Sequence, residues 1–380
     1  MPDPTAATPE DRRTRPARLR AVLVLGSSTG GIGAHVLSLV RGLTAHGVAV
    51  TVAAPAATGE HFGFADAGAR FVPVEIGNSP RPSDMAAARA LRDACANAHV
   101  VHAHGLRAGL VTGSALGRRR PGRIPVVLTL HNAVLATGPR AGFAHLMEGR
   151  AVRIADVVLG ASGDLVDRAR RLGAADARLG PVGAPLLPAP RRDRAAVRAE
   201  LSSTERPILL AVGRLAPQKS YPQLLDAAER WTTLEPVPLL VIAGDGPMRE
   251  ELQARIDADY LPVRLLGHRD DVADLLAAAD VVVLPSRWEA RSLVAQEALR
   301  GGVPLVATDV GGIPELVGDA AVLVPHGDVD ALADAVAGLL ADGSRRAGLA
   351  AAGPAQAQTW PDESDTVSQV LSVYEELGPI

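Results

Sequence analysis

The sequence of 380 residues contains one cysteine, Cys95, which excludes a disulfide framework and any metal site built from several cysteines. We predict that Cys95 is a buried, small apolar residue. Aromatic residues make up only 3% of the chain, so its hydrophobic cores must be built from Ala, Val and Leu. It has no run of 18 apolar residues, and this excludes a transmembrane helix. It also lacks a basic surplus, since 39 Lys and Arg stand against 42 Asp and Glu. That balance argues against a dedicated nucleic-acid-binding protein.

The first 19 residues are polar and contain several arginines. The apolar run that follows, Ala21–Leu25, is too short for a signal peptide and leads into a glycine-rich turn rather than a cleavage site. We therefore expect residues 1–19 to form a disordered tail. We expect the protein to be cytoplasmic, with the inner face of the plasma membrane as the alternative location.

Short apolar runs alternate with helix-like segments twice along the chain, and this pattern predicts two domains of moderate size. The runs are continuous, which is typical of parallel strands covered on both faces. A proline-rich interval within Gly180–Arg206 separates the two sets. We predict a linker at 186–206 between two doubly wound α/β domains. The expected strands are Ala21–Leu25, Val48–Ala53, Arg70–Val74, Val100–His102, Val126–Leu130 and Val157–Leu159, then Ile208–Val212, Pro238–Ala243, Val263–Leu266, Val281–Leu284, Val303–Ala307 and Ala321–Val324.

Lysine occurs once among the 39 basic residues, at Lys219. It belongs to Gly213–Ser220, which follows an expected strand and differs from a Walker A loop by Gln218 in place of the last glycine. Without that glycine we do not expect the loop to wrap around a phosphate. Arg214 and Lys219 remain at the carboxyl end of a strand, where two cations can hold a diphosphate in place of a metal. The alternative is a solvated pair of charges.

A glycine-rich turn, Gly26–Gly33, follows the first expected strand. Glycines allow the backbone to approach a phosphate or sugar closely, and the helix after the turn offers its amino terminus. The spacing fits neither the dinucleotide-binding pattern G-x-G-x-x-G nor the short-chain dehydrogenase pattern. The alternative is a tight turn without a ligand.

Two glutamates, Glu289 and Glu297, follow the expected strand Val281–Leu284. We expect Glu289 in a loop and Glu297 one turn into a helix, with backbone N–H groups near Ser292–Val294 pointing in front of that helix. An anion site between two carboxylates that accept from hydroxyls suits a sugar diphosphate. The alternative is a pair of surface glutamates.

Histidines end two of the expected strands: His102 and His104 end one, and His131 ends the next. A metal site would need further ligands that the sequence does not indicate. We therefore predict no metal, and a histidine that faces a cleft.

Two other charged segments have simple interpretations. The pair Asp328 and Asp330 fits a metal-binding Asp-x-Asp motif, but it begins a helix-like segment, so Asp328 is predicted to cap that helix. The arginines at 118–120 and Arg123 could contact anionic lipid. We favour a solvated loop.

Six segments together have the pattern of a known family: Val212–Leu215, Gly244–Pro247, Leu266–Val272, Val281–Ser286, Gly301–Thr308 and Gly311–Glu315. From about Arg20 to the carboxyl terminus, the chain resembles the retaining glycosyltransferases of family 4. These have the GT-B fold, in which two Rossmann-like domains face each other across a cleft. The turn at Gly30–Val36 is similar to that of the phosphatidylinositol mannosyltransferases.

The resemblance implies an acceptor-side first domain at 20–185, to which residues 360–380 return, and a nucleotide-sugar-binding second domain at 207–359. The catalytic residues it implies are His131, Glu289, Arg214 and Lys219, and it implies that His131 contacts the donor sugar near the reaction centre. The implied donor-binding residues are Gly31, Arg214, Lys219, Gly267, His268, Arg269, Glu289, Ser292, Leu293, Val294 and Glu297. On the acceptor side it implies Gly30, Gly33, His104 and Arg107.

The resemblance also implies transfer of a hexose-type sugar from a nucleotide-diphosphate sugar, with retention and without a metal or other cofactor. The acceptor is expected to be lipid-linked or a small polyol or glycan, with peripheral membrane contact as an option and no nucleic acid partner. One departure is Ala290–Ser292, where the family usually has Gly-Phe-Gly. A non-catalytic nucleotide-sugar-binding protein and a nucleotide-sugar epimerase are the alternatives.

Overall fold

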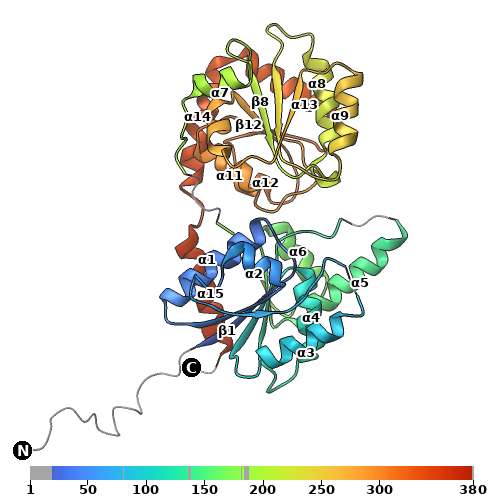
Figure 1. Ribbon diagram of the computed structural model, residues 1–380, viewed down its shortest axis with the longest axis vertical. Helices are drawn as coiled ribbons and strands as arrows, with labels where there is room; N and C mark the ends of the chain where they lie inside the picture. Colours follow the sequence, from blue (N-terminus) through green and yellow to red (C-terminus); the bar gives the residue numbers. More distant parts are fainter. Residues whose placement is uncertain (1–18, 80, 136–137, 181, 184–187, 379–380) are drawn as a thin grey trace, which may run out of the picture. The chain divides into compact units, whose positions relative to one another are not determined.

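Every ladder in the two sheets of the protein is parallel in the computed structural model, which describes residues 19–79, 81–135, 138–180, 182–183 and 188–378 (Figure 1). The chain divides into two compact units. The first comprises 1–160, 166–180 and 363–380, and the second comprises 161–165 and 181–362. The predicted α/β class with two doubly wound sheets is confirmed. The predicted disordered tail at 1–19 lies, except for Leu19, outside the described residues.

The first unit holds a seven-stranded sheet in the order β3-β2-β1-β4-β5-β6-β7. The order reverses between β1 and β4, and in such sheets ligands bind beyond the carboxyl ends of the strands at this point. The three-residue strand β7 has Arg178 at its centre, so no apolar run indicates it in the sequence. The strands are β1 (Arg20–Leu25), β2 (Ala49–Ala54), β3 (Arg70–Pro73), β4 (Val100–His104), β5 (Val126–Leu130), β6 (Val157–Gly160) and β7 (Ala177–Leu179).

The second unit holds a six-stranded sheet in the order β10-β9-β8-β11-β12-β13, which reverses between β8 and β11. Alternate residues of β8 enter two different cores, Ile208 and Leu210 on one face and Leu209 and Ala211 on the other. This explains why the sequence shows continuous apolar runs instead of an alternating pattern. The strands are β8 (Ile208–Val212), β9 (Leu239–Ala243), β10 (Val263–Gly267), β11 (Val281–Leu284), β12 (Leu305–Thr308) and β13 (Val322–Val324).

Helices cover both faces of each sheet. In the second unit, α8, α9 and α13 lie over one face, and α7, α11, α12 and α14 lie over the other (Figure 1). The helices are α1 (Gly31–Ala45), α2 (Ala56–Phe62), α3 (Asp84–Ala94), α4 (Leu106–Leu116), α5 (Pro139–Ile154), α6 (Gly163–Arg171), α7 (Arg194–Glu200), α8 (Tyr221–Trp231), α9 (Arg249–Ala258), α10 (Val272–Ala278), α11 (Leu293–Arg300), α12 (Ile313–Val317), α13 (Val329–Ala341), α14 (Gly343–Ala357) and α15 (Glu363–Leu377), with a 3₁₀ turn η1 at Pro217–Lys219.

The last helix, α15, belongs to the first unit and packs against α1 (Figure 1). Its side chains Val367, Val370 and Val373 are buried in the same core as β1 and α1. A fully buried valine contributes about 1.5–3 kcal/mol relative to an exposed one, so these three side chains anchor the carboxyl terminus to the first sheet.

Two predictions about single residues are confirmed by burial and capping. Cys95 is completely buried, as expected for a small apolar side chain. Asp328 caps α13 by accepting a hydrogen bond from the backbone N–H of Ala331. The prediction of a solvated loop is wrong for Arg123, whose side chain is 4% exposed and pairs with Asp156. Residues 118–120 are exposed as expected.

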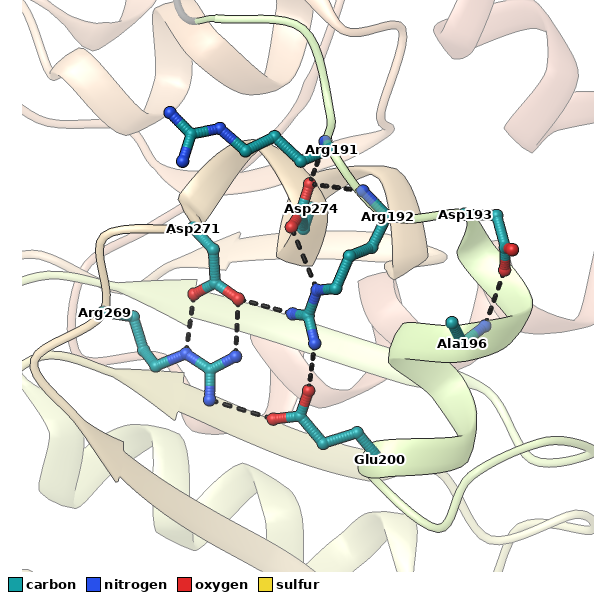
Figure 2. A network of polar contacts seen from close by, with 8 residues as sticks. All are labelled: Arg191, Arg192, Asp193, Ala196, Glu200, Arg269, Asp271 and Asp274. Carbon is teal, nitrogen blue, oxygen red and sulfur yellow. Dashed lines mark hydrogen bonds and ion pairs between the residues drawn. The ribbon is translucent and has the colours of Figure 1, made fainter.

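A network of ion pairs holds the segment before α7 to the start of α10 (Figure 2). The buried carboxylate of Asp274 accepts from the backbone N–H of Arg191 at 2.6 Å and from Arg192. The guanidinium of Arg192 also pairs with Glu200 and Asp271. Much of the interval predicted as a linker is therefore packed on the second unit.

The network makes an acid-dependent contribution to stability that can be measured. The hydrogen bond from Arg192 lowers the pKa of Glu200, and that from Arg269 lowers the pKa of Asp271. A lowered pKa in the folded state stabilises the protein above the unfolded-state pKa, near 4, and this stabilisation is lost as the pH falls through the folded-state value.

We expect Glu200→Gln to lower the free energy of unfolding at pH 7 by about 0.5–1 kcal/mol, because the pair is partly exposed. The difference from the wild type should shrink toward pH 3. Thermal unfolding between pH 3 and pH 7 measures the loss of stability at pH 7 and its decrease toward pH 3. Asp319→Asn, an exposed carboxylate in the same unit, is the control. A difference that stays constant across this range would contradict the assignment.

Candidate functional site

The carboxyl ends of β8 and β11, where the second sheet reverses its order, bring two sequence-predicted residues together. The Nζ of Lys219 donates to the Oε1 of Glu289 at 2.6 Å, although 70 positions separate them. The hydroxyl of Ser286 donates to the same oxygen at 2.7 Å. Glu289 is 8% exposed, so this oxygen is held by a charged and a neutral donor in a largely desolvated place.

The two loops that carry Lys219 and Glu289 are tied to each other by Gln218. Its backbone oxygen accepts from the N–H of Arg287 at 2.8 Å, and its side-chain amide donates to the oxygen of Trp288 at 2.9 Å. The residue that replaces the last Walker A glycine therefore links the loop after β8 to the loop after β11. These two hydrogen bonds hold the two loops together and so fix the distance between Lys219 and Glu289.

Two glycines, Gly311 and Gly312, pack closely against the backbone of the Glu289 loop. A Cβ at Gly311 would lie 2.1 Å from the backbone oxygen of Glu289, and one at Gly312 would lie 2.4 Å from that of Ala290. The N–H of Gly312 donates to the oxygen of Glu289 at 2.9 Å. Gly311 also has φ +55°, which favours glycine. Any larger side chain would push the Glu289 backbone out of place.

Helix α11 begins directly after this loop. Ser292 caps it, with its hydroxyl 3.4 Å from the backbone nitrogen of Ala295. Leu293 and Val294 form the first turn, where the backbone N–H groups lack partners within the helix. Glu297 lies one turn further on, as predicted, and burial raises the pKa of its carboxyl group.

The departure at Ala290–Ser292 has a structural explanation. The guanidinium of Arg291 lies 5.9 Å from the ring centre of Trp360, and within the described part of the chain its Nε and Nη2 are buried without a partner. Burial lowers the pKa of Arg291. The hydroxyl of Ser292 is used as the helix cap. The new charge at this position thus packs on an aromatic ring.

The other residues predicted to bind the donor differ in the exposure and the ion pairing of their side chains. Arg214 is exposed on the loop after β8. His268 is 82% exposed and lies 3.1 Å from Asp270. Arg269 pairs with Asp271 and Glu200 in the network described above. Gly267 accepts a hydrogen bond from the backbone N–H of Gly244 at 2.7 Å, which joins the ends of β9 and β10.

In the first unit, the glycine-rich turn leads into α1. Gly30 and Gly31 are exposed at the start of the helix. Gly33 is buried, and a Cβ there would lie 2.0 Å from the ring of Phe62. The packing of Phe62 on α1 is therefore sufficient to explain why Gly33 is glycine.

Arg107 holds a neighbouring segment of the first unit. Its guanidinium pairs with Asp84 at 2.8 Å and donates to the backbone oxygens of Gly77 and Ser79. The side chain therefore fixes the backbone that leads into α3.

Four histidines gather at the carboxyl ends of β4 and β5. His104 at the end of β4 and His131 after β5 lie 3.3 Å apart between Nδ1 and Nε2, and His35 from α1 faces both. The expectation that the sequence holds no further ligands for these histidines is wrong, because His35, His104 and His131 each offer one nitrogen within 4.8 Å of the others. The third ligand is hidden in the sequence because it lies on a helix 69 positions before His104.

Known sequences and structures resemble this chain over most of its length. The sequence model for glycosyl transferases group 1 matches residues 193–356, and the model for the glycosyl transferase 4-like domain matches residues 30–185. The D-inositol 3-phosphate glycosyltransferase of Xylanimonas cellulosilytica is 31% identical over 91% of this chain and 91% of its own length. The chain is a family 4-like glycosyltransferase of the GT-B fold.

One further relative and one solved structure are similar to the chain, and the structure bears on the fold alone. The alpha-D-kanosaminyltransferase of Streptomyces kanamyceticus is 33% identical, over 49% of this transferase and only half (50%) of its own length. The crystal structure of Anabaena HepE in complex with UDP-glucose matches with a TM-score of 0.79 at 20% identity, over 94% of the transferase and all of that chain. This structural likeness shows the fold. Among the described residues of the transferase, no helix is long and apolar enough to cross a membrane.

Several residues that build the site of this transferase escape sequence reasoning. Gln218 is an ordinary polar residue whose role depends on a contact across 70 positions, and Ser286 is one whose role depends on Glu289, three positions later. The pair Gly311 and Gly312 is visible as a motif, but its purpose becomes clear only from its distance to Glu289. The signal that could have found Ser286 is its place directly after a strand at the reversal of strand order.

Proposed function

We propose that this transferase moves a hexose-type sugar from a nucleotide-diphosphate sugar to a hydroxyl group of an acceptor, with retention of configuration and without a metal. The observation that carries the proposal is the pairing of Lys219 with Glu289 at the strand-order reversal, directly before the amino terminus of α11. Cation, carboxylate and helix terminus supply the three kinds of group that a sugar diphosphate needs.

The diphosphate would be bound by Arg214, Lys219 and the first turn of α11. Charge-assisted hydrogen bonds and a helix amino terminus stabilise negative charge as it develops on a leaving phosphate. Glu289 would accept from hydroxyls of the sugar, and Glu297 from those of the ribose. When the bond between the anomeric carbon and the phosphate oxygen breaks, the acceptor oxygen would bond to that carbon on the same face. The leaving phosphate would take the acceptor proton.

A small polyol is the acceptor class that we favour. The name of the Xylanimonas relative states that it acts on D-inositol 3-phosphate, and the HepE structure contains UDP-glucose. Those are properties of these two proteins, and they suggest which compounds to test first. A lipid-linked acceptor is the alternative, and vesicles that carry such a lipid distinguish the two.

The proposal is tested by incubating the purified chain with a panel of nucleotide-diphosphate sugars and polyol acceptors. Product should form in the presence of a chelator. Strict dependence on Mg²⁺ or Mn²⁺, or an isomerised donor without an acceptor, would contradict the proposal.

Lys219→Ala should weaken nucleoside-diphosphate binding by about 1.5–3 kcal/mol, or about 10–150-fold in Kd, because a charge-assisted contact is lost. Calorimetric titration measures this. Because the substitution also leaves Glu289 without its cation, the melting temperature is measured as well, and Lys219→Arg keeps the charge. Arg345→Ala, an exposed cation in the same unit, is the control. Unchanged affinity in a folded Lys219→Ala variant would remove Lys219 from the diphosphate site.

Substitution of Glu289 and substitution of Glu297 should have different effects on ligand binding. We expect Glu297→Ala to weaken binding of the free nucleoside diphosphate, by about 1 kcal/mol as for an ordinary hydrogen bond. Glu289→Ala should mainly lose discrimination between donor sugars, because its loop faces the sugar in this assignment. Titration with nucleoside diphosphate and with two epimeric donors distinguishes them, and the reverse pattern would exchange the two roles.

His131→Ala tests the role that the family resemblance gives to this histidine. We expect kcat to fall by about 10²–10³-fold, the usual loss when a polar contact to the transition state is removed. Nucleoside-diphosphate binding and the melting temperature should be nearly unchanged. Normal kcat in the folded variant would show that His131 is not catalytic.

A further inference from the structure

Four of the histidines in the first unit, His35, His102, His104 and His131, form one buried cluster of rings. His102 and His104 have ring centres 4.2 Å apart, and His104 and His131 are stacked at 5.5 Å. His35 meets the last two edge-on. Burial lowers the pKa of His35 to about 4 and that of His102 to about 3, and it lowers those of His104 and His131 well below the usual value. All four rings are therefore neutral at pH 7, and each carries one proton on one nitrogen.

His102 is held at both ring nitrogens. Its Nδ1 lies 2.8 Å from the hydroxyl of Tyr374 on α15, and its Nε2 lies 2.6 Å from the hydroxyl of Thr129 on β5. A hydroxyl can donate or accept, so both contacts are satisfied in either tautomer. The ring of His102 is thus fixed, and it forms one wall for the ring of His104.

The hydrogen bond between His104 and His131 can run in two directions. If His131 donated, the proton of His104 would sit on Nε2, which is buried and has no partner among the residues that the structure describes. A buried N–H without an acceptor is among the rarest arrangements in folded proteins. If His104 donates from Nδ1, its Nε2 is an unprotonated nitrogen, and the proton of His131 sits on Nδ1.

The same geometry disfavours a metal at these histidines. Three imidazoles suit zinc. A metal on the Nδ1 of His104 would put the proton on its Nε2, yet metal-bound histidines almost always donate their other N–H to an acceptor. A metal on Nε2 would leave Nδ1–H bonded to His131, whose Nε2 is then occupied. The first choice leaves a buried N–H without an acceptor among the described residues, and the second leaves only the Nδ1 of His131 to bind the metal.

We propose that His104 is a positioning residue that donates from Nδ1 to the Nε2 of His131 and holds His131 in its Nδ1–H tautomer. His131 then offers an N–H group to its ligand, and that ligand atom is an oxygen acceptor of the sugar or phosphate. His102 and Tyr374 keep the ring of His104 in place from the other side. This inference rests on the proposed role of His131 in sugar transfer.

The tautomers are read directly from the ¹⁵N spectrum of the full chain labelled at histidine. His104 and His131 should both be protonated at Nδ1, with the signals assigned by loss in His104→Asn and His131→Asn. A proton on the Nε2 of His104 would overturn the proposal. A cobalt titration that produces the visible absorption of a tetrahedral three-histidine site would overturn it in favour of a metal.

Kinetics test whether the hydrogen bond matters for transfer. An asparagine amide can occupy the place of Nδ1, whereas a glutamine amide occupies that of Nε2. We expect His104→Gln and His104→Leu to lower kcat by about 10–100-fold, by analogy with the loss seen for partners that orient metal-bound histidines, with little change in the donor KM. His104→Asn should restore most of kcat. Equal losses in the Asn and Gln variants would show that His104 acts through packing alone.

Tyr374→Phe should lower kcat by a smaller factor, and Tyr260→Phe, at a side chain that is 92% exposed, should not change it. Equal kcat in these two variants would show that Tyr374 does not help to keep the ring of His104 in place. Normal kcat in His131→Ala would refute the proposed role of His131 and the catalytic part of this inference with it. The ¹⁵N spectrum of the histidine rings would still decide whether His104 donates the hydrogen bond to His131.

Discussion

Parallel pairing of strands is the constraint on which the remaining structure depends. Each strand must return by a crossover, so all strands of a sheet end at the same edge. Where the order reverses, successive crossovers lie on opposite faces, and the loops at that point are free to approach a ligand. In the second unit this point falls between β8 and β11, and the loops after those two strands carry Lys219 and Glu289.

A lysine at this point has different properties from an arginine. Its ammonium group is a compact charge with three donors that can turn, whereas a guanidinium presents a fixed fork. A compact donor can bond to the carboxylate of Glu289 and still turn toward a phosphate oxygen. The pair is largely removed from water, and the desolvation of two charges costs free energy that a structural role alone rarely offsets. This gives a physical reason for lysine at the one position where an arginine-rich chain uses it.

The sequence was sufficient for the architecture, apart from β7, and for the positions of Lys219 and Glu289 after two strands of the second unit. Continuous apolar runs predicted the strands, and Lys219 and Glu289 follow two of them. It was insufficient wherever a role depends on packing between distant segments. Gly33 is adjacent to Phe62, Arg123 is buried beside Asp156, and His35 meets two histidines from other strands. No local pattern encodes such contacts, because each partner alone looks like an ordinary residue.

The candidate site of the second unit contains charged side chains, whereas the histidine cluster of the first unit is neutral. The chemistry of sugar transfer gives a reason for this difference. The second unit keeps charged groups, which suits a diphosphate on which negative charge develops. The first unit buries four histidines together, and burial lowers the pKa of each, with a smaller contribution from neighbouring histidines at His102, His104 and His131. During transfer, positive charge develops at the anomeric carbon. A protonated histidine close to that carbon would oppose this charge, whereas a neutral ring can donate a hydrogen bond without doing so. If His131 contacts the donor sugar as the family resemblance implies, the cluster that lowers its pKa matters for the reaction as much as the histidine itself.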